Sequence, residues 1–342
     1  WVSIHNGGGL VYLSMIHSKL DKKGNLILLD HRAKKHIKPF SNAKIKFFKK
    51  SPYRNFLVFK ERLKNNQIFK KNIKNLNKKI YFHEYYLSGI PPLIRFPISQ
   101  NKVFVLFQNR NLFSYLNYFN DNLFFKFNFI VYHILHFLLI NIFLKDSDTI
   151  IVQTSSMRNK ISRIKPKNRI IVEKNYWENC DFNAINFYSK KLNRKKGILL
   201  KIRNAAKTNN LFFYPASLEP HKNHKILLKS FIKLKDFSTK NFKVVLTINP
   251  SDLPNNFRNN DFIIFIGNQP LEIIHEIYKL VDFLIFPSLN ESLGLPLLEA
   301  SFYKLPIIAS DLEFVYDVCK PKYTFDPYSS EDIYNKILIS LN

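Results

Sequence analysis

Short apolar runs alternate with longer amphipathic or polar stretches along most of the chain. This alternation is typical of strands that are separated by helices. Because the runs are continuous and not interleaved with polar residues, they predict parallel strands that are buried on both faces of a sheet. Strands are expected at 26–30, 44–49, 80–83, 103–107, 148–154 (including a polar turn), 169–172, 211–217, 243–248, 262–266 and 282–285. Helices are expected at 56–66, 127–144, 225–235, 271–280 and 330–341.

The chain has 342 residues, which is more than one hydrophobic core usually serves, so two domains are expected. An apolar fraction of 46% is sufficient for two buried cores. The segment 166–207 is basic and poor in periodicity, and apart from the strand 169–172 it is predicted to be an irregular linker.

The stretch 286–300 combines the end of a buried strand, a polar loop and the start of a helix. Pro287 and Ser288 end the strand, and Pro296 suits the first turn of a helix, where its missing N–H would be unpaired anyway. In an open parallel sheet, ligands bind beyond the carboxyl ends of the strands, and the free N–H groups of a helix attract phosphate there. The pattern therefore predicts a phosphate-binding site.

Two carboxylates flank this predicted site, Glu291 in the loop and Glu299 in the helix, with seven residues between them. Ionised carboxylates are strong acceptors for O–H donors, so a ribose diol or sugar hydroxyls would explain acidic residues at a place otherwise suited to anions. The spacing alone fits equally well a capped helix that carries a solvated glutamate.

These residues resemble the signature of retaining glycosyltransferases of family 4, in which two glutamates are separated by seven residues. The resemblance implies the GT-B fold, an α/β architecture of two doubly wound, Rossmann-like domains that face each other across a cleft. It assigns acceptor binding to residues 1–207, which include the linker, and donor binding to residues 208–342, with the family's final crossing helix expected to be missing. The matching positions are Pro287-Ser288, Glu291-Ser292, Gly294-Leu295-Pro296, Glu299-Ala300 and 306–311.

The function that the resemblance implies is transfer of a hexosyl unit, of mannosyl or glucosyl type, with retention at the anomeric carbon. The donor would be a GDP- or UDP-linked sugar, and the acceptor a saccharide or a polyprenyl-linked molecule in the synthesis of cell-surface polysaccharide or lipopolysaccharide. No divalent metal and no cofactor besides this co-substrate are implied. The alternative is an inactive GT-B partner subunit that binds nucleotide sugar without transfer.

The resemblance also assigns residue roles around the donor. Lys222 would meet the diphosphate, and the amides of Gly294 and Leu295 would stabilise the same leaving group. Glu299 would hold the ribose, and Glu291 would act near the sugar or its departing phosphate. Donor binding is also expected at Ser292, at Gly267 and Asn268 near the base, and at Gly8 and Gly9.

The glycines at 7–9 follow what reads as the end of a strand, and they form either a plain tight turn or a loop that approaches a ligand closely. His83 ends the predicted strand 80–83, and it is either an acceptor-side contact or a structural histidine. Two positions depart from the family. Ser217 replaces a common arginine, and Lys304 replaces a glycine that would end a helix in a left-handed conformation.

The charge is strongly positive, with 53 Lys and Arg against 25 Asp and Glu, or +28. Nucleic acid, an anionic membrane surface and phosphorylated substrates all suit this charge, but so does the over-use of Lys and Asn that an AT-rich genome produces. The excess is spread along the chain, and no aromatic-basic nucleic-acid motif is present, so an RNA-binding protein is the weaker hypothesis and no specific nucleic acid is expected.

A membrane surface is a candidate partner because excess lysine accompanies the apolar segment 112–144 in the first domain. Within it, 127–144 fits a covering helix or a borderline membrane span. The two cysteines, Cys180 and Cys319, show neither metal-ligand spacing nor a disulfide framework, which suits a reducing cytoplasm. We therefore expect a cytoplasmic protein that is peripheral on the inner face of the plasma membrane.

Overall fold

The computed structural model describes two compact units, residues 1–186 and 187–342. The division falls earlier than the predicted boundary at 207, because helix α6 (Lys196–Ala206) packs against a strand and a helix of the second unit. The prediction of an irregular linker was therefore wrong for these residues. The residues that the structure describes are 17–23, 25–30, 34, 39–48, 83–86, 102–107, 137–138, 140–173 and 196–342.

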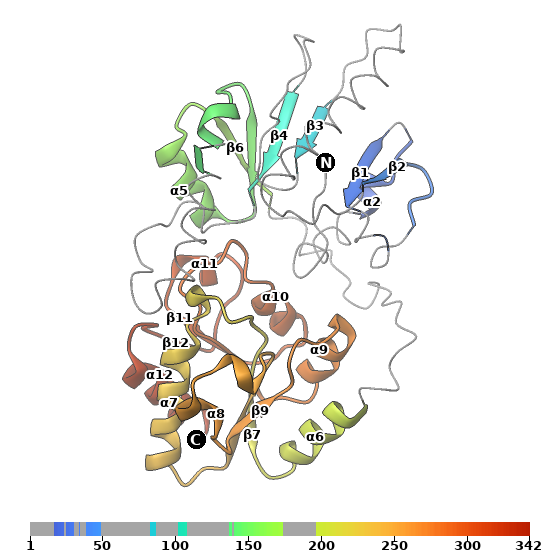
Figure 1. Cartoon of the computed structure of the whole chain (residues 1–342). Coiled ribbons are helices and arrows are strands. Elements are labelled where there is room, and N and C mark those ends of the chain that lie inside the picture. Colours follow the sequence, from blue (N-terminus) through green and yellow to red (C-terminus); the bar gives the residue numbers. More distant parts are fainter. Residues whose placement is uncertain are drawn as a thin grey trace, which may run out of the picture. The chain divides into compact units, whose positions relative to one another are not determined.

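The first unit contains two parallel sheets in its described part (Figure 1). One has the strand order β3-β4-β5-β6, and the other pairs β1 with β2. A hydrophobic core lies where Val105, Ile150 and Val152 of the larger sheet meet Met157 and Ile161 of α5. The elements are α2 (His17–Leu20), β1 (Leu26–Asp30), β2 (Lys44–Phe48), β3 (His83–Tyr86), β4 (Lys102–Leu106), β5 (Thr149–Val152), α5 (Ser155–Ile164) and β6 (Arg169–Val172).

The predicted strand 80–83 differs from the structure. Strand β3 begins at His83, which pairs with Lys102 at the amino end of β4, so the predicted end of the strand is its beginning in the described part. Residues 80–82, the predicted helix 56–66 and the glycines 7–9 lie outside the described residues.

The predicted helix 127–144 is described only near its end. Residues 137–138 and 140–143 are helical, and Ile140 and Leu144 are buried in the core of the first unit, as a covering helix requires. None of the helices in the described ranges combines the length and the apolar character that a membrane span needs.

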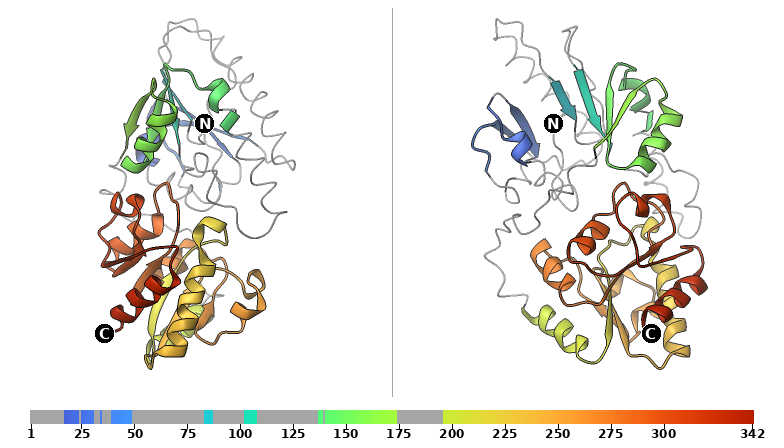
Figure 2. Two further views of the ribbon diagram at one scale, coloured as in Figure 1. Left: turned by 90° about the vertical axis from the view of Figure 1, so that its left-hand side faces the viewer. Right: turned by 180° about the vertical axis from the view of Figure 1, so that it is seen from behind.

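The second unit is built on a six-stranded parallel sheet with the order β12-β11-β10-β7-β8-β9 (Figures 1 and 2). Its strands are mostly apolar, and every residue of β10 is buried, as the continuous apolar runs predict. The strands are β7 (Asn210–Tyr214), β8 (Phe242–Leu246), β9 (Ile263–Phe265), β10 (Phe283–Phe286), β11 (Ile307–Ser310) and β12 (Tyr323–Phe325).

Helices cover both faces of this sheet (Figure 2). On one face, α7 packs extensively against α12, and on the other, α9 contacts both α6 and α10. Together they enclose one continuous core that runs from Leu199 to Ile337. The helices are α7 (His224–Phe237), α8 (Asn255–Arg258), α9 (Leu271–Tyr278), α10 (Leu295–Phe302), α11 (Glu313–Tyr316) and α12 (Ser330–Ser340), with short 3-10 turns η4 (Pro220–Lys222) and η5 (Pro250–Asp252).

The strand order places a topological switch between β7 and β10. From β7 the chain moves to β8 and β9 on one side, and from β10 it moves to β11 and β12 on the other. The loops that leave β7 and β10 therefore diverge at their carboxyl ends, which in doubly wound sheets is where ligands bind. These loops carry two of the residues expected at the donor, Lys222 after β7 and Glu291 after β10.

Candidate active site

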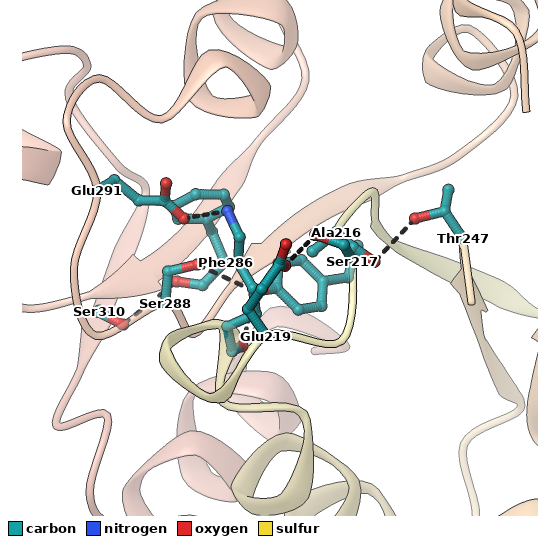
Figure 3. Close-up of polar contacts among 10 residues, drawn as sticks. Ala216, Ser217, Glu219, Thr247, Phe286, Ser288, Glu291 and Ser310 are labelled. Atoms are coloured by element: carbon teal, nitrogen blue, oxygen red, sulfur yellow. Dashed lines mark hydrogen bonds and ion pairs between the residues drawn. The ribbon is translucent and has the colours of Figure 1, made fainter. Parts of the chain in front are cut away.

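A hydrogen-bond network joins the loops after β7 and β10 (Figure 3). Tyr214, the last residue of β7, donates from its hydroxyl to the carbonyl oxygen of Lys222 at 2.6 Å. Its single hydrogen is then engaged, so the hydroxyl of Ser288, 3.0 Å away, donates to the Tyr214 oxygen. Both side chains are fully buried, and burial raises the pKa of Tyr214 well above its usual value, so the phenol stays protonated. The network fixes the backbone position of Lys222.

Asn223 reinforces this connection. Its backbone is left-handed, with φ of 59°, and it caps the start of α7. Its side-chain amide donates to the carbonyl oxygens of Pro287, at 3.2 Å, and Pro327, at 2.7 Å. The amide of Leu289 also donates to the carbonyl oxygen of His221 at 2.8 Å. Three loops at the carboxyl edge of the sheet are thus held together around Lys222.

Lys222 and Glu291, two residues predicted to be catalytic, are in direct contact, which is the dashed line at Glu291 in Figure 3. The Lys222 Nζ lies 2.6 Å from Glu291 Oε1, and the side chains are only 17% and 12% exposed. A charge-assisted hydrogen bond between largely desolvated groups is stronger than an ordinary surface ion pair. The ammonium predicted to meet a diphosphate is therefore held at a fixed place by the carboxylate predicted to act near the sugar.

The neighbouring position Ser217 holds no cation. Its hydroxyl donates to the carboxylate of Glu219, so this part of the loop carries a negative charge where the resembled family has an arginine. Lys222 is consequently the cation that this loop offers to an anion within the described residues.

The start of α10 is shaped by Gly294, and Pro296 lies in its first turn, as the sequence predicts. Gly294 is left-handed, with φ of 70°, and a Cβ there would lie 3.0 Å from Leu297 Cδ1. Leu295 is the first helical residue, and Pro296 follows in the first turn. The N-terminus of α10 thus opens toward the carboxyl end of β10 with the amide groups that favour phosphate.

Glu299 lies one turn further along α10, and it is buried, with 5% of the residue exposed. Its Oε2 accepts a hydrogen bond from the hydroxyl of Tyr278, in α9, at 2.9 Å. Burial raises the pKa of Glu299 to about 7, an effect that the hydrogen bond from Tyr278 partly offsets. The alternative of a solvated glutamate on a capped helix is therefore wrong for this residue.

The expected base-side loop follows β9. Gly267 is left-handed, with φ of 61°, so its backbone conformation favours glycine, and a Cβ at this position would lie 2.8 Å from Asn249 Oδ1 and displace that side chain. Asn268 is exposed beside it. The glycine brings this loop close to η5, and the role of both residues in base binding stays a prediction.

Of the remaining predicted site residues, Ser292 and His83 lie in the described part of the chain. Ser292 lies in the loop between Glu291 and Gly294, half-buried. Gly8 and Gly9 lie outside the described residues. His83 begins β3, so it does not lie at the carboxyl end of that strand, where it was expected. Its acceptor-side role stays a prediction.

Lys304 adopts the left-handed conformation expected for a glycine position, with φ of 55°. The amide of Leu305 donates to Ala300 O at 2.9 Å and that of Lys304 to Ser301 O at 3.0 Å, which is the Schellman pattern that ends a helix. The prediction of a strained helix end is confirmed.

Sequence reasoning missed Tyr214, Asn223 and Tyr278, and it named Ser288 without its contact to Tyr214. Tyr214 and Tyr278 end apolar segments and read as core residues, which they also are, because the polar end of an aromatic side chain leaves no periodic signal. Among the described residues, no group of three or more His, Cys, Asp or Glu side chains could hold a metal ion.

Comparisons with known proteins agree with this architecture. Residues 195–342, the second unit almost entirely, match the family model described as Glycosyl transferases group 1. Among curated proteins, no significant match is found.

Solved structures match over the whole chain. HepE from Anabaena, solved in complex with UDP and glucose, is 13% identical with a TM-score of 0.65, over 100% of this chain and 88% of that one. Sucrose-phosphate synthase from Thermosynechococcus elongatus is 13% identical with a TM-score of 0.67, over 98% and 84%. WaaG, a glycosyltransferase involved in lipopolysaccharide biosynthesis, is 12% identical with a TM-score of 0.60, over 100% and 89%.

These likenesses confirm the GT-B fold with two Rossmann-like domains. The group 1 match adds that the unit carrying Lys222, Glu291 and Glu299 is similar in sequence to group 1 glycosyltransferase domains. Fold and domain match together support a glycosyltransferase that uses a nucleotide sugar.

Proposed function

We propose that the protein is a retaining, metal-independent hexosyltransferase. It moves a mannosyl- or glucosyl-type unit from a GDP- or UDP-linked sugar to a saccharide or lipid-linked acceptor in cell-surface polysaccharide synthesis. The observation that carries the proposal is the contact between Lys222 and Glu291 at the switch point of the second sheet, 2.6 Å between Nζ and Oε1. A cation and a carboxylate held there suit the two parts of a sugar diphosphate: the cation suits the anionic diphosphate, and the carboxylate accepts hydrogen bonds from the sugar hydroxyls.

The leaving group defines the work of Lys222 in this proposal. As the glycosidic bond breaks, negative charge builds on the diphosphate, and a fixed ammonium together with the amides of Gly294 and Leu295 stabilises that charge without a metal ion. Because Tyr214 and Asn223 hold the turn around Lys222, little reorganisation is needed when the charge develops. A lysine acts here as a point charge, and its ammonium has three N–H donors, so it can contact Glu291 and phosphate together.

Glu291 serves the sugar side. An ionised carboxylate can accept several hydrogen bonds, so beside its contact with Lys222 it can accept from the hydroxyls of the hexose, which orients the anomeric carbon. Glu299 takes the ribose, and Gly267 with Asn268 borders the base. The acceptor belongs to the first unit in this proposal, with His83 as its candidate contact, whereas Gly8 and Gly9 belong to donor binding.

A donor panel tests the proposal. Purified protein is incubated with UDP-glucose, GDP-mannose and related donors, with polyprenyl-linked and free saccharide acceptors, and nucleoside diphosphate release and product mass are measured. We expect one donor to support transfer, an α-linked product from an α-linked donor by NMR, and unchanged rates with a chelator.

Two results would revise the proposal in different ways. Tight donor binding without release of nucleoside diphosphate would identify the protein as a nucleotide-sugar-binding partner subunit, which the serine at position 217 favours. Loss of activity with the chelator, restored by a divalent metal, would overturn metal independence alone.

A further inference from the structure

Two helices of the second unit are joined by a buried polar clamp. Tyr278 and His275 lie on one face of α9, and Glu299 and Tyr303 lie on one face at the end of α10. The Tyr278 hydroxyl donates to Glu299 Oε2 at 2.9 Å, and Tyr303 shares a hydrogen bond of 2.8 Å with His275 Nδ1. The residue that the proposed function assigns to the ribose is thus held by a residue of another helix.

The phenol of Tyr278 has little freedom. Its ring stacks on Tyr303, with centroids 5.7 Å apart and an angle of 14°, and meets the edge of Phe213 at 5.2 Å. Its hydroxyl also lies 3.4 Å from the carbonyl oxygen of Pro296, in the first turn of α10. Tyr278 is 2% exposed. Because its ring is held on two sides, the Tyr278 hydroxyl is fixed in place beside the Glu299 carboxylate.

We propose that Tyr278 is a positioning residue of the nucleotide site: its hydroxyl fixes the rotamer of the Glu299 carboxylate and occupies one of its acceptor positions, leaving the others for the ribose diol. The proposal rests on the proposed function. An ionised carboxylate accepts about four hydrogen bonds, and in the described part of the chain Tyr278 supplies the one side-chain donor to it. Glu299 lies about 6 Å along the axis from Leu295, where the phosphates are expected.

The same contact sets the ionisation of the site. Burial raises the pKa of Glu299 to about 7, and the hydrogen bond from Tyr278 lowers it. Removing the phenol hydrogen should therefore raise the pKa further. Of the neighbouring groups, Tyr278 and Tyr303 have raised pKa values and His275 has a lowered pKa of about 4, so none of these titrates between pH 6 and 8. Glu276 and Lys279, the charged groups next along α9, act on Tyr303 and His275.

The test measures donor affinity against pH by calorimetry. The probe is whichever of UDP-glucose and GDP-mannose binds the wild-type protein more tightly, because a diphosphate esterified at both ends lacks the second phosphate ionisation near pH 6. If the ionised carboxylate is the binding form, wild-type affinity should be about tenfold weaker at pH 6 than at pH 8. In Tyr278→Phe the midpoint should move to higher pH and affinity at pH 7 should fall.

Two matched controls isolate the contact. Tyr303→Phe removes a hydroxyl from the same clamp without touching Glu299, so it should keep the wild-type midpoint. Glu299→Gln should give a flat profile between pH 6 and 8. A carboxyl titration by carbon-13 NMR, assigned by comparison with Glu299→Gln, gives the pKa of Glu299 in wild-type protein directly, so the result does not depend on how well Tyr278→Phe folds.

The outcomes separate the two proposals. A wild-type midpoint near pH 7 that rises in Tyr278→Phe supports the positioning role. An unchanged midpoint in Tyr278→Phe, an equal loss of affinity at every pH, or a Glu299 carboxyl that titrates below pH 5 would overturn it while the proposed function stands. Binding of neither donor by wild-type protein would overturn the proposed function and the role of Tyr278 with it.

Discussion

Replacing Glu299 by glutamine should stabilise the folded protein, and more at pH 8 than at pH 5. Burial raises the pKa of this carboxyl from 4.5 to about 7. An acid whose pKa is higher in the folded state binds its proton more tightly there. The folded state therefore becomes less stable as pH rises from the pKa of the unfolded chain to that of the folded protein. Glutamine has nearly the same shape, carries no charge and accepts the Tyr278 hydrogen bond.

The magnitude follows from the two pKa values. The full effect of ionising Glu299 in the folded state is about 3 kcal/mol, reached above pH 7, and at pH 5 it is about 1 kcal/mol. His224 and His275, with pKa values lowered to about 3 and about 4, contribute in the opposite direction between pH 4 and 6.5, because the unfolded chain takes up their protons. The difference between variant and wild type cancels these histidines, so that difference is the quantity to measure.

Urea unfolding at pH 5 and pH 8 provides the assay. Both tryptophans, Trp1 and Trp177, precede the second unit, so circular dichroism is the suitable signal. Glu313→Gln, at an exposed glutamate of α11, is the matched control and should change the free energy of unfolding by less than about 0.5 kcal/mol at either pH. An equal effect of Glu299→Gln at both pH values would refute the reasoning, because the carboxyl would then titrate as it does in the unfolded chain.

Four further outcomes are expected. Glu299→Gln should weaken donor binding by about 1–3 kcal/mol in calorimetry at pH 8, and unchanged affinity would remove Glu299 from the site. Lys222→Ala should lower kcat by about 10²-fold or more in steady-state kinetics, and Lys222→Arg should recover part of that loss. The control Lys225→Ala, at an exposed lysine, should leave kcat nearly unchanged. Full kcat in Lys222→Ala would place the diphosphate elsewhere. Lys304→Gly should stabilise the second unit by about 0.5–1 kcal/mol in urea, since glycine adopts its backbone conformation without a Cβ clash, and a loss of stability would contradict this. Sedimentation with liposomes should show more binding to anionic than to neutral vesicles, and equal or absent binding to both would leave genome composition as the source of the charge.

The parts of the second unit that sequence predicted are those set by local chemistry. The strand before Pro287 and the helix start around Pro296 depend on neighbouring residues, and each was found where the pattern placed it, while the left-handed Lys304 follows the glycine position of the resembled family. Helix α6 was missed because its lysine- and arginine-rich sequence resembles the basic linker before it, and only its packing against α9 and β7 gives it a place.

The candidate site was predicted as a set of residues and not as a set of contacts. The spacing of Glu291 and Glu299 indicated two acidic groups beside a helix start, yet one is paired with Lys222 and the other is buried against Tyr278. These partners come from elements 69 and 21 residues away in sequence. Nothing local distinguishes the two glutamates, because their environments are decided by which strands and helices become neighbours.

The conformation of Asn223 restricts which residues this position can accept in a mutational scan. Glycine and aspartate tolerate the left-handed backbone, but neither carries the amide hydrogens that reach Pro287 O and Pro327 O. Residues that do carry such donors, such as glutamine or lysine, meet the steric cost of positive φ. Asparagine alone among the common residues satisfies both demands, so a library at position 223 should return nearly a single amino acid, whereas exposed Lys225 two positions later should accept almost any.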